Sequence, residues 1–145
     1  RMLPVAGAFH SRLCEDAARR VGEMALLNQA GPEAACPIFS SVDGALLKPE
    51  GSLRDHFSRQ IRSRVNFMAM VRNMASRCDL MIEVGPGRVL TGLVKDITGQ
   101  SSVACLPVEH SPGNATDLNR VLAVLFANGV PIFWEGLFEN RLIRP

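Results

Sequence analysis

Hydrophobic residues follow a helical spacing between Ser11 and about Asn28. They recur at intervals of three and four residues, which places them on one face of an amphipathic helix. Ser11 is a suitable N-cap, and Glu15 and Asp16 favour the positive end of the helix dipole. We therefore expect this helix to face a core through Leu13, Ala17, Val21, Met24 and Leu27.

The rest of the chain alternates between short apolar runs and longer periodic stretches. The short runs, bounded by glycine and proline turns, are typical of strands, whereas periodic stretches with a serine, threonine or aspartate cap are typical of helices. Such alternation predicts an α/β domain with a largely parallel sheet and right-handed crossovers. The apolar tail after Gly129 lacks a helical period and is expected to be extended. The expected strands are residues 3–9, 37–42, 79–84 and 103–108, and the further helices are 53–61, 66–77, 89–97 and 116–128.

Composition narrows the class of protein. The 145 residues suit one domain, and 47% hydrophobic with 21% charged residues argues against disorder. A net charge of +2 with scattered basic residues does not support nucleic-acid binding. The four cysteines lack the spacing of a zinc site, so we expect free thiols and no bound metal. No apolar run of membrane-spanning length or signal sequence is visible, so we expect a soluble, cytoplasmic protein.

His10 is the strongest candidate for chemistry. It follows an apolar run and precedes a helix, and reactive groups in open α/β sheets gather beyond the carboxyl ends of strands. An exposed imidazole there can act as a general base, although a structural histidine is the alternative. The chain has no Gly-x-Ser-x-Gly elbow, so we expect a nucleophile from outside it. Of the other histidines, His56 is expected to be solvated on a helix, and His110 ranks second as a candidate.

Two other segments are ambiguous from their residues alone. The loop 83–87 looks like a phosphate loop, but its glycine spacing does not fit one, and a tight strand-to-helix turn explains it better. Arg59 and Gln60 lie side by side on an expected helix, where such residues are usually exposed and without a role.

Four motifs in order resemble the C-terminal half of an acyltransferase domain of polyketide and fatty acid synthases, the malonyl-CoA:acyl-carrier-protein transacylase family. The resemblance covers nearly the whole chain. The motifs are Leu3-Pro4-Val5 with Gly7-Ala8-Phe9-His10-Ser11, Pro37 to Gly44, Arg59-Gln60 before Val65-Asn66-Phe67, and Glu83 to Gly87 followed by Val89-Leu90.

This resemblance implies a reaction and three site residues. A serine outside this chain would take the malonyl group from malonyl-CoA as an ester and pass it to the phosphopantetheine thiol of an acyl carrier protein, with no bound cofactor. His10 matches the general base, and Gln60 matches the position whose main-chain carbonyl holds the second ring nitrogen. Phe9 matches a position associated with malonyl selectivity, although Gly7 departs from the histidine common in modular synthases.

The resemblance also implies the domain organisation. Residues 1–128 would be the C-terminal portion of the acyltransferase, with a hydrolase-like parallel-sheet core. Within this range, residues 1–5 would be the last strand of a separate ferredoxin-like subdomain. Residues 129–145 would be the linker that follows, and the ending is similar to that of iterative enediyne-type synthases. The expected partners are the serine-bearing N-terminal part, an acyl carrier protein and neighbouring domains such as a ketosynthase. Two alternatives stay open: a non-catalytic docking or scaffold module, and an α/β-hydrolase that uses water.

Overall fold

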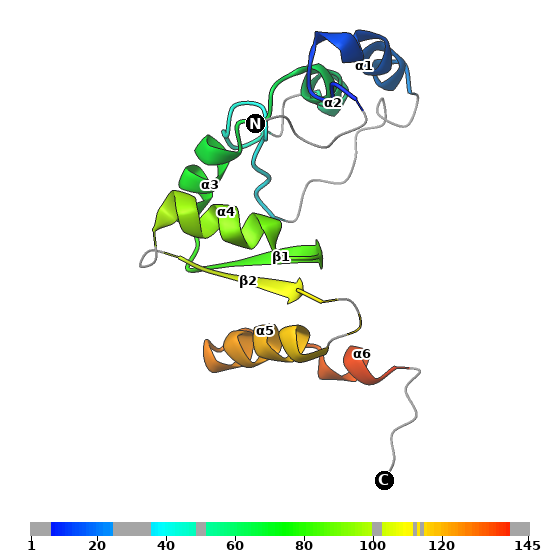
Figure 1. The fold of residues 1–145 in the computed structure, drawn as a ribbon. Coiled ribbons are helices and arrows are strands. Elements are labelled where there is room, and N and C mark those ends of the chain that lie inside the picture. Colours follow the sequence, from blue (N-terminus) through cyan, green and yellow to red (C-terminus); the bar gives the residue numbers. More distant parts are fainter. Residues whose placement is uncertain are drawn as a thin grey trace. The chain divides into compact units, whose positions relative to one another are not determined.

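The computed structural model describes residues 7–24, 36–48, 52–99, 103–111, 113 and 115–139. The chain divides into two compact units, Arg1–Arg77 and Cys78–Pro145. Their secondary structure is drawn in Figure 1. Residues 1–6, which include the expected end of a ferredoxin-like subdomain, and residues 140–145 of the expected linker lie outside the described residues.

The first unit is mainly helical. It contains the 3₁₀ turn η1 (Arg12–Cys14) and the helices α1 (Glu15–Gly22), α2 (Leu53–Arg62) and α3 (Phe67–Ala75). Ser52 caps α2 by accepting from the Asp55 N–H at 3.2 Å, and Asn66 caps α3 by accepting from the Ala69 N–H at 3.3 Å. These two helices confirm the prediction from the sequence, because their caps and spacing are local signals.

The expected helix over residues 11–28 is shorter and turned differently. It ends at Gly22, Met24 is not helical, and residues 25–28 lie outside the described residues. Ala18 is the buried side chain, whereas Leu13 and Met24 are 84% and 51% exposed. The predicted inner face was therefore wrong by about one position, because α1 packs on α2 through small side chains and not through its largest ones.

The expected strand over residues 37–42 is also corrected. Phe39 makes a single antiparallel bridge with Leu46, and residues 41–43 form a turn. Hydrogen bonds of 2.8 Å run from the Ser40 N–H to the Ala45 carbonyl and from the Leu47 N–H to the Ile38 carbonyl. This segment is thus a small hairpin, and residues 7–9, the end of another expected strand, are irregular.

The second unit contains a parallel strand pair, as predicted. Strands β1 (Leu80–Pro86) and β2 (Ala104–Glu109) pair in parallel, with Leu80 opposite Ala104 and Glu83 opposite Pro107. Helix α4 (Val89–Thr98) connects them, and Figure 1 shows α4 and α5 (Ala115–Ala127) on opposite sides of the pair. Met81 and Cys105 are buried in this unit, with Val94 of α4 and Val121 of α5.

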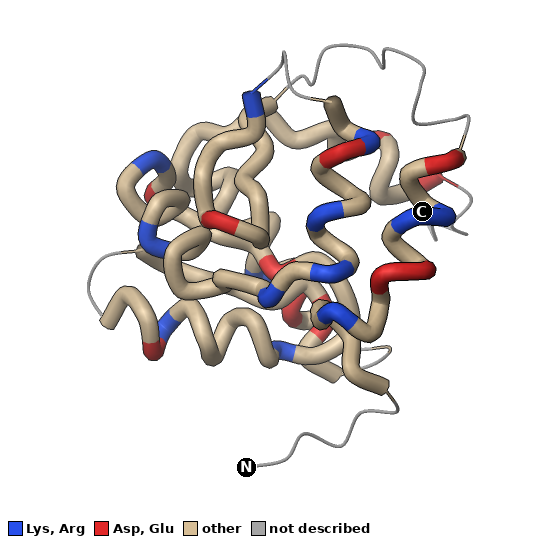
Figure 2. Tube along the Cα trace, turned by 90° about the horizontal axis from the view of Figure 1, so that it is seen from above, with Lys and Arg blue, Asp and Glu red and all other residues tan. Residues whose placement is uncertain are grey.

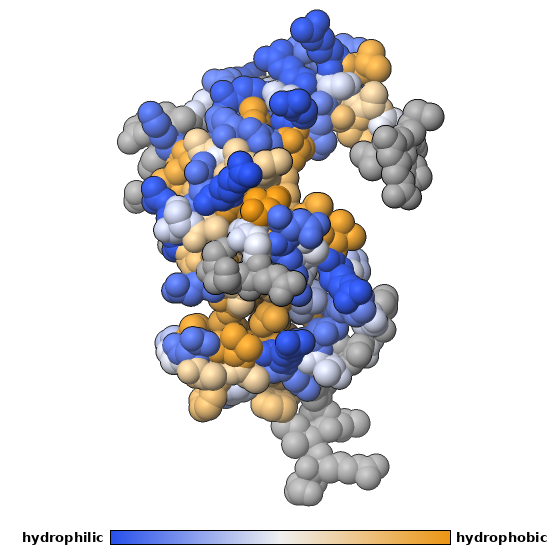
Figure 3. All heavy atoms as spheres, turned by 60° about the vertical axis from the view of Figure 1, so that its left-hand side comes forward, coloured by the Kyte–Doolittle hydropathy of each residue, from blue (hydrophilic) through white to orange (hydrophobic). Residues whose placement is uncertain are grey.

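One face of β1 carries no described cover. Val84 is 85% exposed and Ile82 is 37% exposed, whereas Met81 and Glu83 on the alternate face are buried. Parallel strands are normally buried on both faces. The space-filling view shows hydrophobic residues at the surface among hydrophilic ones (Figure 3).

The tail departs from the extended form that its sequence predicted. Residues 134–138 form a short helix, α6 (Trp134–Phe138), and the Trp134 ring makes an edge contact with Phe126 of α5 at a centroid distance of 6.0 Å. The apolar contact with α5 compensates for the weak helical period, since tertiary packing overrides local pattern in short segments. Phe133 and Phe138 remain 70% and 50% exposed.

Candidate active site

His10 lies in a tight loop that leads into η1. Its φ is +56°, in the left-handed region that is uncommon for residues other than glycine. The Ser11 hydroxyl donates to the Ala8 carbonyl at 2.6 Å, and the Cys14 N–H donates to the Ser11 carbonyl at 3.0 Å. These bonds hold the backbone in its unusual conformation, and strain of this kind is often retained at functional sites. The His10 side chain is exposed, so a reacting group can approach it.

Gln60 supplies the partner of the His10 ring. His10 Nδ1 lies 3.0 Å from the Gln60 carbonyl oxygen. This carbonyl is in the last turn of α2, where the carbonyls lack partners within the helix. Because a carbonyl can only accept, the hydrogen bond requires a proton on Nδ1, which leaves Nε2 of a neutral ring as an acceptor. The expected contact is present, and the catalytic role of both residues stays a prediction.

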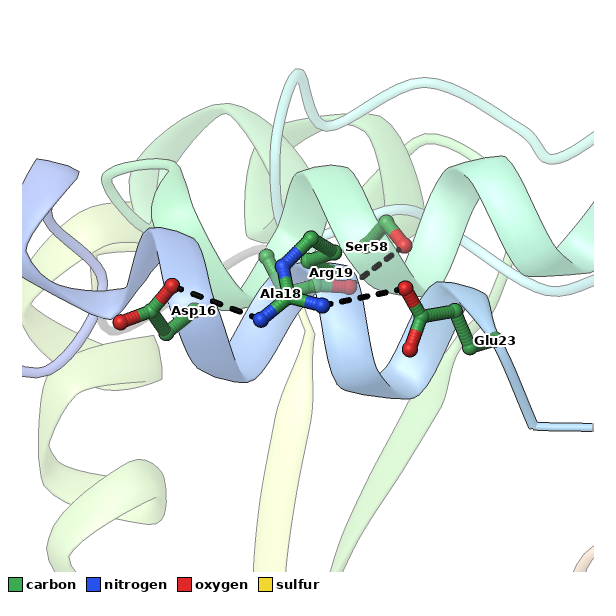
Figure 4. Close-up of polar contacts among 5 residues, drawn as sticks. All are labelled: Asp16, Ala18, Arg19, Glu23 and Ser58. Carbon is green, nitrogen blue, oxygen red and sulfur yellow. Dashed lines mark hydrogen bonds and ion pairs between the residues drawn. The ribbon is translucent and has the colours of Figure 1, made fainter.

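Close packing of α1 on α2 fixes the elements that carry the two residues. The Ser58 hydroxyl of α2 donates to the Ala18 carbonyl of α1 at 2.9 Å, and a Cβ added to Gly22 would lie 2.7 Å from the Ser58 Oγ. Figure 4 shows Ser58 directed at the backbone of α1, on which Arg19 bridges Asp16 and Glu23. Arg62 also pairs with Glu15 at 2.7 Å. Small side chains thus bring the two helices together beside His10.

Phe9 lies in the same loop, directly before His10. Its ring is near Gly7, since a Cβ added to Gly7 would lie 3.6 Å from Phe9 Cζ. Phe9 is 68% exposed, so its ring is available for contact with a bound group.

His56 is not solvated, contrary to the prediction. It is 8% exposed, and its Nδ1 is buried without a hydrogen-bond partner among the described residues. Burial, with a smaller contribution from the charge of Arg59, lowers the pKa of His56. It lines a pocket of about 590 Å³ between the hairpin and α2, and the lining residues include neither His10, Phe9 nor Gln60. The pocket is therefore separate from the candidate catalytic residues.

The loop after β1 is a structural turn with a buried carboxylate. Glu83 accepts from the Leu90 N–H at 3.0 Å, the Thr91 N–H at 2.7 Å and the Thr91 hydroxyl at 2.6 Å. The N-cap residue Arg88 makes no side-chain cap, so Glu83 caps α4 from the preceding strand. Burial raises the pKa of Glu83, but these hydrogen bonds lower it by more. The sequence predicted the turn but not the role of Glu83, since only tertiary structure places a strand residue at a helix end.

The other candidates contribute little to this site. The His110 N–H donates to Asp117 at 2.9 Å, so Asp117 anchors the loop after β2 from the first turn of α5. No disulfide links the four cysteines, all of which are described, and burial raises the pKa of Cys78. Within the described ranges, no group of three or more His, Cys, Asp and Glu residues is placed to hold a metal ion. In the same ranges no helix is both long and apolar enough to span a membrane.

The known proteins that resemble this chain include polyketide synthases and malonyl CoA-acyl carrier protein transacylases. No protein-family model matches the chain. It is 35% identical over 153 residues to a polyketide synthase of Streptomyces halstedii, covering 99% of this chain and 3% of that protein. It is 32% identical over 97 residues to the malonyl CoA-acyl carrier protein transacylase of Bacillus subtilis strain 168, covering 66% of this chain and 30% of the transacylase. This chain is therefore homologous to part of a polyketide synthase and to part of a malonyl CoA-acyl carrier protein transacylase.

A solved structure supports the same acyltransferase fold. The acyltransferase domain of the iterative polyketide synthase of enediyne biosynthesis matches with a TM-score of 0.74 at 26% identity, over 96% of this chain and 35% of that domain's chain. This chain therefore spans about a third or less of the length of the relatives described here. The α/β architecture with a small parallel sheet agrees with the acyltransferase fold.

Proposed function

We propose that this chain is the histidine-bearing portion of an acyltransferase that moves a malonyl group from malonyl-CoA to the phosphopantetheine thiol of an acyl carrier protein. The observation that carries the proposal is the exposed His10 ring, whose Nδ1 faces the Gln60 carbonyl at 3.0 Å. Homology to malonyl transacylases and polyketide synthases supports the reaction class. In this proposal residues 1–128 belong to the C-terminal portion of a hydrolase-like acyltransferase domain, with the end of a ferredoxin-like subdomain at residues 1–5.

The proposed reaction uses His10 twice in each half-cycle. Nε2 accepts the proton of a serine hydroxyl as the serine oxygen attacks the malonyl thioester, and the imidazolium then returns that proton to the departing CoA thiolate. The Gln60 carbonyl keeps the proton on Nδ1 and stabilises the charge that develops on the ring. The second half-cycle repeats these transfers with the carrier-protein thiol as nucleophile and the serine as leaving group. No cofactor is required by this chemistry.

The serine is proposed to come from a part of the protein that this chain does not contain. The lengths of the relatives allow for such a part, because this chain spans only 30% of the Bacillus subtilis transacylase. The exposed face of β1 at Ile82 and Val84 is where further strands or helices of the same domain would pack. Residues 129–145 are proposed to be the linker to neighbouring synthase domains such as a ketosynthase, a role that suits the exposed rings of Phe133 and Phe138.

Phe9 is proposed to favour malonyl over methylmalonyl groups, because it directly precedes His10 in the same loop and its bulky, exposed ring would take up room that an α-methyl group needs. A single methyl group is worth about 1 to 3 kcal/mol in a pocket, so the preference would be partial. Competition between malonyl-CoA and methylmalonyl-CoA tests this role. Phe9→Ser should reduce the preference by about 10-fold, and an unchanged ratio would refute it.

Transfer from radiolabelled malonyl-CoA tests the function itself. With the serine-bearing part present, His10→Ala should lower transfer to carrier protein by at least ~10²-fold, the usual contribution of a general base. His110→Ala is the matched control, since only the main chain of that exposed histidine makes a described contact. Unchanged transfer in His10→Ala contradicts the proposal. Carrier-protein binding without transfer favours a scaffold module, and release of free malonate favours a hydrolase.

A further inference from the structure

The turn formed by residues 40–45 is rigidly closed on itself. The Gly44 N–H donates to the Ser40 carbonyl at 2.9 Å, and the Ser40 hydroxyl accepts from the Val42 N–H at 3.1 Å. The Asp43 carboxylate accepts from the Ala45 N–H at 3.0 Å. Ser40 is only 3% exposed. With its backbone groups paired in this way, the turn can act as a fixed support for the residues around it.

Helix α3 and the residue before it anchor this turn. Gly44 has a φ of +75°, and a Cβ added there would lie 2.7 Å from backbone and side-chain atoms of Ala69 and from the Met70 nitrogen. The Asn73 amide donates to the Gly44 carbonyl at 2.8 Å, and the Asn66 N–H donates to the Ser41 carbonyl at 2.7 Å. The turn is therefore seated directly on the backbone of α3.

The same turn also holds the end of α2 that contacts His10. Gln60 Nε2 donates to the Ser41 Oγ at 3.0 Å, and Arg59 pairs with Asp43 at 3.6 Å. Two consecutive residues of α2 are thus bound to two residues of the turn. Gln60 has a double function, because its amide meets Ser41 while its main-chain carbonyl meets His10 Nδ1.

We propose that Ser41 is a positioning residue for His10, acting through the Gln60 side chain to hold the Gln60 carbonyl against His10 Nδ1. The inference rests on the proposed function, in which His10 is the general base. The position of a main-chain carbonyl is set by the backbone that carries it. The position of the Gln60 carbonyl therefore depends on the contacts that hold the last turn of α2. The carbonyls of a last helical turn fray readily, because they lack partners within the helix.

Substitutions at both ends of this hydrogen bond test the proposal in the acyltransferase assembled with its serine-bearing part. Ser41→Ala removes the acceptor, Gln60→Met removes the donor while keeping the carbonyl, and Ser41→Thr restores a hydroxyl. Ser76→Ala is the matched control, since it removes a serine hydroxyl bonded at 2.9 Å to the Asn73 carbonyl at the other end of α3. Steady-state transfer from malonyl-CoA and long-range ¹H–¹⁵N NMR of the His10 ring are the two readouts.

We expect Ser41→Ala and Gln60→Met each to lower kcat by about 10-fold, with KM for malonyl-CoA changed less than about 2-fold. The loss is smaller than the ~10²-fold that a full 1 Å misplacement can cost, because the carbonyl itself remains. The double variant should fall no further than either single one, since both remove the same interaction. The NMR spectra should show a smaller population of the Nδ1–H tautomer, Ser41→Thr should recover both readouts, and Ser76→Ala should match the wild type.

Failure of this inference is distinguishable from failure of the proposed function. If His10→Ala abolishes transfer but Ser41→Ala and Gln60→Met keep the wild-type kcat and tautomer, Ser41 does not position His10. The inference is also overturned if Ser41→Thr does not recover the kcat lost in Ser41→Ala, or if Ser41→Ala raises KM and leaves kcat unchanged. If His10→Ala retains transfer, the proposed function fails, and the tautomer measurement still decides whether Ser41 orders the ring.

Discussion

Each of the two units, taken by itself, is stabilised by a different kind of contact. The first unit, which carries His10, relies on polar contacts between side chains and backbone, such as Ser58 on Ala18 and Gln60 on Ser41. The second unit is built on a parallel strand pair covered by α4, with one buried carboxylate that joins strand and helix. Polar contacts are directional and fix the orientation of individual groups, whereas apolar packing mainly fixes how elements stack.

The two units also differ in net charge. Residues 1–77 contain 11 Lys or Arg and 7 Asp or Glu, a net charge of +4, whereas residues 78–145 contain 5 and 7, a net charge of −2. In Figure 2 the basic and acidic residues are interspersed along the trace. The described ion pairs Arg19–Asp16, Arg19–Glu23, Arg59–Asp43 and Arg62–Glu15 all lie in the first unit, which also carries the candidate chemistry, so its integrity should depend on single residues.

The largest effect is expected at the turn of the first unit. Gly44→Ala combines a left-handed φ with contacts of 2.7 Å to the backbone of α3, and we expect a loss of about 3 kcal/mol. Gly129→Ala, with a φ of +72° and nothing within 4 Å of the new Cβ, is the matched control and should cost about 1 kcal/mol. Hydrogen exchange in each unit measures both. Equal losses would show that the turn is not seated on α3 in solution.

The buried carboxylate of the second unit comes next. Glu83→Gln keeps the shape but loses the charge that caps α4, and we expect a loss of about 2 kcal/mol. The lowered pKa of Glu83 means that its contribution is complete above about pH 4.5 and falls as the carboxylate is protonated below it. The protection of α4 amides against hydrogen exchange, measured as a function of pH, should fall in acid in the wild type and not in Glu83→Gln. An identical acid profile in the variant would contradict the role of Glu83.

Acid should affect the first unit at a higher pH than the second. The pKa of His56 is lowered, so below about pH 6.5 the unfolded chain takes up a proton that the folded one does not, and stability declines. We expect the protection of α2 amides against exchange to fall as the pH drops below about 6.5, before that of α4 amides falls. His56→Phe should remove this dependence, and a wild-type pH profile in that variant would show that another group is responsible.

The smallest effects should come from two helical glycines. Gly92→Ala in α4 has nothing within 4 Å of the new Cβ and should stabilise the second unit by up to about 1 kcal/mol. Gly22→Ala in α1 would place its Cβ 2.7 Å from the Ser58 Oγ, and the displaced contact should cancel that gain. Thermal unfolding of the two variants measures the difference. A gain of equal size at both positions would show that α1 and α2 pack less closely than described.

The local signals in the sequence determined much of the fold. The expected helices at residues 53–61, 66–77 and 89–97 agree with α2, α3 and α4, and the apolar runs at residues 79–84 and 103–108 predicted the parallel pair. The family resemblance also placed His10 next to the Gln60 carbonyl, 50 residues away, and that contact is present. Caps and buried strands are read easily because their causes lie within a few residues of each other.

Only the tertiary structure decided how separate segments meet. In the structure, α1 buries Ala18 and not its larger side chains, His56 is buried, and the expected strand at residues 37–42 is part of a hairpin. Ser41 contacts Gln60, and Glu83 contacts the start of α4. Each of these depends on the close approach of residues distant in the chain, where a glycine without a Cβ or a serine able to reach a carbonyl matters more than hydrophobicity. Periodicity measures which side of an element is apolar, and it contains no information on which partner fits there.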